Sequence, residues 1–180
     1  MRKLLLLGGG GHARVCIDVV NAGSRWEING IIERDGFRGG DSCGQPVLGT
    51  DRHMPMFISK GTPVLVAIGQ LRSPDQRISL YSRALELGAD FPVVQSPNAY
   101  VSPNAIVAEG TVVVHGAVLN PYCHVGQQCI INSKALVEHD AIVGDFCHIS
   151  TGAILNGGVH VGEGAFVGSG AIGREGVKIG

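Results

Sequence analysis

The first half of the chain alternates short apolar runs with stretches of helical periodicity. The apolar runs predict strands at 3–7, 28–32, 63–68 and 91–94. The helical spacing predicts helices at 12–21 and 74–87, the second of which is closed by Gly88. Residues 1–95 are therefore expected to form a small α/β domain with a parallel sheet, about half of a full Rossmann-like dinucleotide-binding fold.

The second half has a strict internal period, because an aliphatic residue recurs at every sixth position from Val101. The series is Val101, Val107, Val113, Leu119, Val125, Ile131, Val137, Val143, Ile149, Leu155, Val161, Val167 and Ile179, with Gly173 as its exception. Two residues before each of these positions, the side chain is small or β-branched. Since side chains alternate along a strand, both positions are predicted to face inward.

This pattern resembles the hexapeptide repeat of the left-handed parallel β-helix. The resemblance implies that residues 96–180 form a triangular prism with 18 residues per coil and a little over four coils. The left hand comes from the resemblance, since general topology rules favour right-handed crossovers.

The residue before each inward aliphatic is expected to point outward, so every eighteenth residue falls on the same face. The three faces are Val118, Leu136, Ile154 and Ile172; Val112, Ile130, His148 and Phe166; and Ile106, His124, Ile142, His160 and Lys178. The first face is wholly aliphatic. We expect other copies of the chain to cover it around a threefold axis, giving a homotrimer.

Composition narrows the function classes. The 180 residues include 28 glycines, 44% hydrophobic and 16% charged residues, and carry a formal charge of −1. These values indicate a folded protein and argue against a disordered tail or an electrostatic binder of nucleic acid. Four leucines before Gly8 are too few for a signal peptide or membrane span, so we expect a cytoplasmic protein.

Cysteine spacing argues against a disulfide framework and a structural zinc site, because the five cysteines form an odd set without a C-x-x-C pair. Histidine spacing likewise argues against a carbonic anhydrase-like zinc site, so no metal is expected. Cys147 is a conceivable nucleophile, but it occupies a small inward position of the repeat and is interpreted as core packing.

The glycine loop at 8–13 matches G-x-G-x-x-A between a strand and a helix, and Glu33 follows about 20 residues later. This spacing suits a nucleotide whose phosphates bind at a helix N-terminus. Two readings stay open beside it, a nicotinamide-dependent oxidoreductase and a tight turn without a ligand.

His139 lies two residues after an inward aliphatic and is flanked by Glu138 and Asp140. Histidine is the side chain best suited to proton transfer near neutral pH, and an adjacent carboxylate can orient it. His139 is therefore a candidate general base, the alternative being a solvated corner.

His148 points outward on an otherwise apolar face, where it could line a ligand cleft or make a structural hydrogen bond. His124 and His160 share another face and are interpreted as packing or surface residues.

Taken together, these motifs resemble the sialic acid O-acetyltransferase (NeuD-like) family, which includes the PglD-like N-acetyltransferases acting on nucleotide-linked amino sugars. The matching segments are 8–12, 66–69, 131–133, 137–140 and 144–150. The chain departs from the family pattern at Ala13, at Asp140 in place of glutamate, and in stopping at Gly180. Family members usually continue with further coils that complete the coenzyme site. The chain is therefore either truncated or the ordered part of a longer one, and the completeness of its coenzyme site stays open.

The resemblance implies roles for particular residues. His139 would be the general base and Asp140 its partner, while Asn132, His148 and Gly157 would lie at the acetyl-CoA site. The sugar nucleotide would contact Gly10, Gly11 and His12, with Glu33, Arg34 and Gln70 nearby.

The function expected from the sequence is acetyl transfer from acetyl-CoA to a nucleotide-linked amino sugar of the 4-amino-4,6-dideoxy type, for bacterial surface glycans. The alternatives are O-acetylation of a sialic-acid-type sugar and a catalytically silent trimeric binding module. The nucleotide base, the sugar and the acyl chain length stay open.

Overall fold

The computed structural model describes residues 1–38 and 40–180. They divide into two compact units, which we call the α/β unit (Met1–Gly69 and Asp75–Pro92) and the β-helix unit (Gln70–Pro74 and Val93–Gly180). The chain therefore leaves the α/β unit after Gly69, returns at Asp75 and leaves it again after Pro92.

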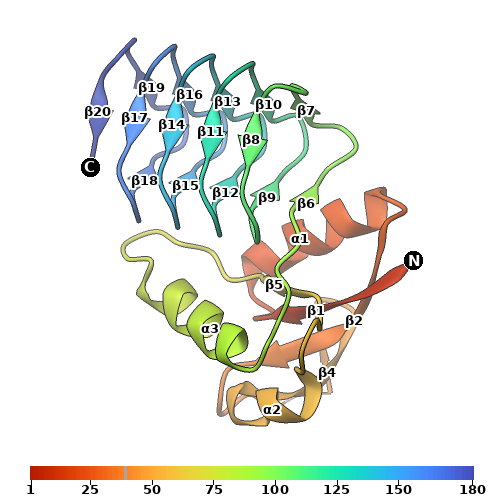
Figure 1. Cartoon of the computed structure of the whole chain (residues 1–180). Coiled ribbons are helices and arrows are strands. Elements are labelled where there is room, and N and C mark those ends of the chain that lie inside the picture. The colour runs from red at the N-terminus through yellow and green to blue at the C-terminus, as the bar shows by residue number, and fades with distance from the viewer. Residues whose placement is uncertain (39) are drawn as a thin grey trace. The chain divides into compact units, whose positions relative to one another are not determined.

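The α/β unit is built on a five-stranded sheet in the order β3-β4-β2-β1-β5. Figure 1 labels four of these strands, β1, β2, β4 and β5. Its strands are β1 (Arg2–Leu7), β2 (Trp26–Glu33), β3 (Asp41–Ser42), β4 (Gln45–Thr50) and β5 (Val64–Val66). Its helices are α1 (Gly11–Ala22), the 3-10 turn η1 (Asp51–His53), α2 (Met54–Phe57) and α3 (Asp75–Glu86). All strand pairs are parallel except that of β3 with β4.

The apolar runs of the sequence form the centre of this sheet. Leu4 to Leu7 of β1 are at most 2% exposed, because β1 pairs with β2 on one side and β5 on the other. The predicted strands at 3–7, 28–32 and 63–68 and both predicted helices are present, so the expectation of an α/β fold is confirmed. The antiparallel edge strand β3 makes the sheet mixed rather than parallel throughout.

The predicted strand at 91–94 is wrong. Only Val94 of that segment is in a strand, β6 (Val94–Gln95), and β6 pairs with β9 (Val112–Val113) in the β-helix unit. Phe91 instead packs against the ring of Tyr81 in the α/β unit, with 4.7 Å between ring centroids. Pro92 has no N–H to donate to a sheet, so the run cannot continue through it.

The β-helix unit consists of two-residue parallel strands stacked in three five-stranded sheets (Figure 1). The first sheet contains β6, β9, β12 (Ile130–Ile131), β15 (His148–Ile149) and β18 (Phe166–Val167). The second contains β7 (Tyr100–Val101), β10 (Val118–Leu119), β13 (Leu136–Val137), β16 (Ile154–Leu155) and β19 (Ile172–Gly173). The third contains β8 (Ile106–Val107), β11 (His124–Val125), β14 (Ile142–Val143), β17 (His160–Val161) and β20 (Lys178–Ile179).

The six-residue period sets the core of this unit. The aliphatic and small positions form one cluster. Its buried members between Val113 and Val167 are at most 5% exposed, and Ala165 packs against them partly buried. Partners in neighbouring strands are 18 residues apart, as Val118 and Leu136 are. The predicted parallel β-helix is thus confirmed, and its stacking begins at Val94 rather than at Val101.

The outward positions sort into the three predicted faces, one on each sheet. We call the outer surface of the second sheet the apolar face: Tyr100, Val118, Leu136, Ile154 and Ile172. Ile172 is 67% and Tyr100 is 55% exposed in the single chain. Within the described residues, no helix is long and apolar enough to cross a membrane.

Candidate functional site

The glycine loop after β1 has two structural and two open positions. Gly8 has a φ of +94°, and a Cβ atom there would overlap the side chain of Ile68. A Cβ at Gly9 would overlap Ser42 Oγ and Glu33 Oε1. In contrast, a Cβ at Gly10 or Gly11 would meet no atom within 4 Å, which leaves open space at the N-terminus of α1.

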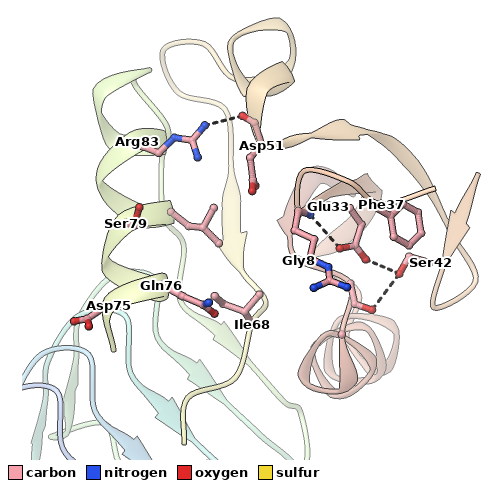
Figure 2. A pocket seen from close by; sticks show the side chains of 14 residues that line it. Gly8, Glu33, Phe37, Ser42, Asp51, Ile68, Asp75, Gln76, Ser79 and Arg83 are labelled. Carbon is pink, nitrogen blue, oxygen red and sulfur yellow. Dashed lines mark hydrogen bonds between the residues drawn. The ribbon is translucent and has the colours of Figure 1, made fainter. Parts of the chain in front are cut away.

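Glu33 ends β2 beside this loop and is 8% exposed. Its Oε1 lies 3.0 Å from Ser42 Oγ, and its Oε2 accepts a hydrogen bond from the Arg34 backbone N–H at 3.2 Å. Ser42 Oγ also lies 3.0 Å from the Gly9 carbonyl (Figure 2). Ser42 thereby fixes the Glu33 carboxylate against the glycine loop.

A cavity of about 810 Å³ opens between the carboxyl ends of the strands and helix α3. Its lining residues are Gly8, Gly9, Gly10, Glu33, Arg34, Phe37, Ser42, Asp51, Ile68, Asp75, Gln76, Ser79, Leu80 and Arg83. Ligands of open α/β sheets bind at this edge, where phosphates can also meet the N-terminus of a helix.

The cavity brings together three of the six residues predicted to contact a nucleotide, namely Gly10, Glu33 and Arg34. Gly11 and His12 lie in the first turn of α1 but do not line it. Gln70 is in the β-helix unit and is 3% exposed.

His139 lies at a corner of the β-helix between β13 and β14. Its Nδ1 is 2.8 Å from Asp140 Oδ2, and both side chains are nearly two-thirds exposed. Asp140 has a φ of +60°, the conformation that carries the chain around the corner. The hydrogen bond to Asp140, helped by the Asp140 and Glu138 charges, raises the pKa of His139.

This pair fixes the tautomer of the imidazole. Because Nδ1–H donates to the Asp140 carboxylate, the neutral ring of His139 carries its lone pair on Nε2. An exposed, oriented Nε2 can accept a proton from a bound nucleophile.

Gly157 lies directly under this ring, one coil further along the chain. A Cβ at Gly157 would come within 2.8 Å of His139 Cε1 and 2.9 Å of Nε2. The Gly158 N–H also donates to the His139 carbonyl at 3.0 Å. Only glycine at 157 therefore allows the ring to lie across the next coil.

His148 is 5% exposed and uses both ring nitrogens inside the β-helix unit. Nδ1 lies 2.7 Å from the Gln70 carbonyl, so Nδ1 carries the proton and donates it. Nε2 lies 3.0 Å from Asn132 Nδ2, which donates to it, while Asn132 Oδ1 accepts the Ser133 N–H at 2.8 Å. The Phe166 ring packs edge-on at 5.2 Å between centroids.

Gln70 is held on the β-helix by its side chain as well. Its Nε2 donates to the Gly164 carbonyl at 2.9 Å, and a Cβ at Gly164 would come 3.0 Å from Pro74 Cγ. Asn132, His148 and Gln70 thus form one hydrogen-bonded network that fastens the segment Gln70–Pro74 to the rest of the β-helix unit.

Sequence reasoning missed Ser42, Asp51 and Arg83. They come from a short strand, a 3-10 turn and a helix that share no motif, and only the fold places them in one cavity. In the described part of the chain, no group of three or more His, Cys, Asp or Glu side chains is arranged to hold a metal.

The family model for the PglD N-terminal domain matches residues 3–83. The acetyltransferase domain of PglB from Neisseria gonorrhoeae is 32% identical with a TM-score of 0.86, over 99% of this chain and 85% of that chain. The same domain in complex with acetyl coenzyme A matches at 32% identity and a TM-score of 0.86, over 98% and 84% of the two chains.

A third similar structure is a histidine-to-asparagine variant of perosamine N-acetyltransferase from Caulobacter crescentus, in complex with CoA and GDP-perosamine. It is 28% identical with a TM-score of 0.82, over 99% of this chain and 91% of that chain. A search of curated proteins gave no match.

Proposed function

The chain belongs to the NeuD/PglD-like family of sugar acetyltransferases, and we propose that it transfers the acetyl group of acetyl-CoA to the amino group of a nucleotide-linked 4-amino-4,6-dideoxy sugar. Such products serve the synthesis of bacterial surface glycans. The observation that carries the proposal is the exposed His139–Asp140 pair lying across Gly157 on the β-helix.

His139 is proposed as the general base. Nε2 removes a proton from the sugar amine as the amine nitrogen attacks the thioester carbonyl carbon. The C–N bond forms, the C–S bond breaks, and the CoA thiolate leaves and takes up a proton. Asp140 keeps the ring in the reactive tautomer and stabilises the imidazolium that forms.

The cavity of the α/β unit is proposed to hold the nucleotide part of the substrate. The backbone at Gly10 and Gly11 would receive the diphosphate at the N-terminus of α1, and Glu33 would accept hydrogen bonds from ribose hydroxyls. The perosamine N-acetyltransferase of Caulobacter crescentus, which was solved with a GDP-linked sugar, supports a nucleotide-linked substrate.

The acetyl-CoA site is proposed to lie beside the His139 corner, with Gly157 close to the reacting groups. The complex of the PglB domain with acetyl coenzyme A supports this donor. Asn132 and His148 already bond each other, so we assign them to the walls of this site rather than to its hydrogen bonds with the coenzyme.

A homotrimer completes the proposal. His139 stands at an edge of the apolar face, whose Ile172 and Tyr100 are more than half exposed in one chain. A neighbouring copy covering that face would bury these side chains and enclose the corner. The free thiols of the five cysteines fit a reducing, cytoplasmic setting.

The test measures thiol release from acetyl-CoA with UDP-, dTDP- and GDP-linked 4-amino-4,6-dideoxy sugars. Turnover is expected on at least one of them, and His139→Ala should reduce it by about 100-fold or more. His160→Ala, which removes an exposed histidine from another strand of the same prism, is the matched control and should keep full activity.

Three outcomes would contradict parts of the proposal. If the His139→Ala variant is active, the assignment of His139 as general base is wrong. If the product is an ester, the enzyme acetylates a hydroxyl group and not an amine. An absence of turnover on every sugar, by a chain shown to be trimeric by light scattering, would reject the amino-sugar substrate.

A further inference from the structure

Asp51 supplies the cavity with a carboxylate opposite α3 and separate from Glu33, while a third acidic residue, Asp75, lines it at the start of α3. It begins η1 directly after β4, and its backbone carbonyl accepts a hydrogen bond from Arg83 Nη2 at 2.8 Å. Figure 2 shows its side chain directed into the space between α3 and Glu33. Burial, with the nearby Asp35 and Glu33 charges, raises the pKa of Asp51 against the opposing effect of Arg83.

The two carboxylates limit what part of a ligand can face them. An ionised carboxylate accepts hydrogen bonds and donates none, so it repels phosphate oxygens and carbonyl groups. The phosphates therefore belong at the N-terminus of α1, where backbone N–H groups point outward. Glu33 and Asp51 must face the hydroxyl and N–H donors of the nucleoside.

Glu33 and Asp51 divide these donors between them. Glu33 ends β2, the position from which an acidic side chain reaches the ribose hydroxyls in folds of this type. It already accepts the Arg34 N–H and contacts Ser42. Asp51 lines the same cavity as Glu33, and its side chain is directed into the space between α3 and Glu33 (Figure 2), so we place it beside the ribose position, where the base begins.

The bases differ in the donors that they offer to a carboxylate. Guanine presents N1–H and the N2 amino group side by side, which match the two oxygens of a carboxylate. Uracil and thymine present one N–H between two carbonyl oxygens, which a carboxylate repels. Adenine and cytosine offer an amino group next to an acceptor nitrogen. The side chains of Ile68 and Leu80 add apolar surface for a flat ring in the same cavity.

We propose that Asp51 selects a guanine nucleotide by accepting hydrogen bonds from N1–H and N2–H of the base. This inference rests on the proposed function, because it assigns the base of the nucleotide that the cavity holds. The amino sugar would then be GDP-linked.

The test exploits a change of hydrogen-bond pattern. In Asp51→Asn, one oxygen becomes an amide donor of nearly the same shape. Guanine then loses an acceptor for its amino group, whereas xanthine, which has a carbonyl at that position, gains a donor. Titration calorimetry of GDP, UDP, dTDP and xanthosine diphosphate is run on the whole chain and on Asp51→Asn. Asp90→Asn, at an exposed carboxylate in the same unit, is the matched control.

The unaltered chain is expected to bind GDP at least about 10-fold more tightly than UDP or dTDP. Asp51→Asn should weaken GDP binding by about 10- to 100-fold and tighten xanthosine diphosphate binding by about 10-fold. A misfolded variant cannot produce this gain, and Asp90→Asn should keep the original order.

Other results overturn the inference in distinguishable ways. If UDP binds as tightly as GDP, or Asp51→Asn leaves GDP binding unchanged, the assignment of guanine to Asp51 fails while the nucleotide cavity stands. If none of the four diphosphates binds, the nucleotide cavity of the proposed function fails as well.

Discussion

The two units place their candidate functional residues in different ways. In the β-helix unit, His139 belongs to a column of corner residues 18 apart, with Pro121 before it and Gly157 after it. In the α/β unit, the cavity is lined from the loop after β1, the end of β2, the edge strand β3, the turn η1 and helix α3.

This difference predicts how substitutions act. A substitution in the β-helix affects the residue stacked one coil away, because neighbouring strands pair in strict register. A substitution in the cavity affects side chains that lie far away in the sequence. A Cβ at Gly9, for example, would displace Ser42 and Glu33.

The largest effect is expected from the core of the β-helix. Leu155 is fully buried in β16 between Val137 and Gly173. Leu155→Ala leaves a cavity that the regular coils cannot collapse to fill. It should lower the free energy of unfolding by about 2–5 kcal/mol. Urea denaturation followed by circular dichroism measures this change. Leu85→Ala, at a half-exposed leucine of α3, is the control and should cost far less.

The second effect tests the stacked pair itself. Gly157→Ala would push a methyl group into the His139 ring, and a displacement of about 1 Å can cost on the order of 100-fold in rate. We expect that loss in acetyl transfer with an unchanged unfolding transition. Gly168→Ala is the matched control, because a Cβ there would meet no atom within 4 Å. Equal activity of the two variants would show that the ring position is unimportant.

The third effect belongs to the α/β unit. Gly9→Ala would displace Ser42 and Glu33, and we expect the affinity for the nucleotide sugar to fall by about 10-fold or more through loss of hydrogen bonds to the carboxylate. Binding of acetyl-CoA should be unaffected. Calorimetry with each substrate separates the two results. Gly23→Ala, where a Cβ makes only ordinary contacts, is the control, and a parallel loss of acetyl-CoA affinity in Gly9→Ala would contradict the separation.

The sequence predicts the two units unequally, for physical reasons. Inward positions of the β-helix could be predicted because the same environment recurs every six residues. The repeat therefore shows the same pattern of aliphatic and small side chains many times over. The His139–Asp140 contact was within reach because the two residues are adjacent. The contact of His139 with Gly157 could also be predicted, because the two residues are 18 apart and one coil has 18 residues. That prediction requires knowledge of the coil geometry.

The remaining features have no such repetition. Strand β3 has only two residues. Strand β4 has six, but they are at most partly buried and include a proline, a glycine and two polar residues, so no period marks either strand. Ser42 and Asp51 reach the cavity only through the order of the strands in the sheet. The segment 91–94 reads as a strand because its apolar residues are buried, yet Phe91 and Val94 are buried in different units.

The smallest effect separates the two carboxylates beside His139. The base must be neutral to act, so activity falls as the pH drops below the pKa of His139. The hydrogen bond that His139 donates to Asp140 is the largest influence that raises this pKa, and the Glu138 charge is the smallest. Asp140→Asn should therefore move the acid limb of the kcat profile to lower pH, and Glu138→Gln should move it in the same direction by less.

Asp140→Asn should also lower kcat on the alkaline plateau by about 10-fold or more, because the amide no longer holds the tautomer or stabilises the imidazolium. Glu138→Gln should leave this plateau nearly unchanged, since Glu138 contacts the backbone N–H of His139 rather than its ring. The measurement is kcat from pH 5 to pH 9 for the unaltered chain, Asp140→Asn and Glu138→Gln. If Glu138→Gln shifts the limb as far as Asp140→Asn does, the charge around the corner sets the pKa, and the hydrogen bond to Asp140 has no special role.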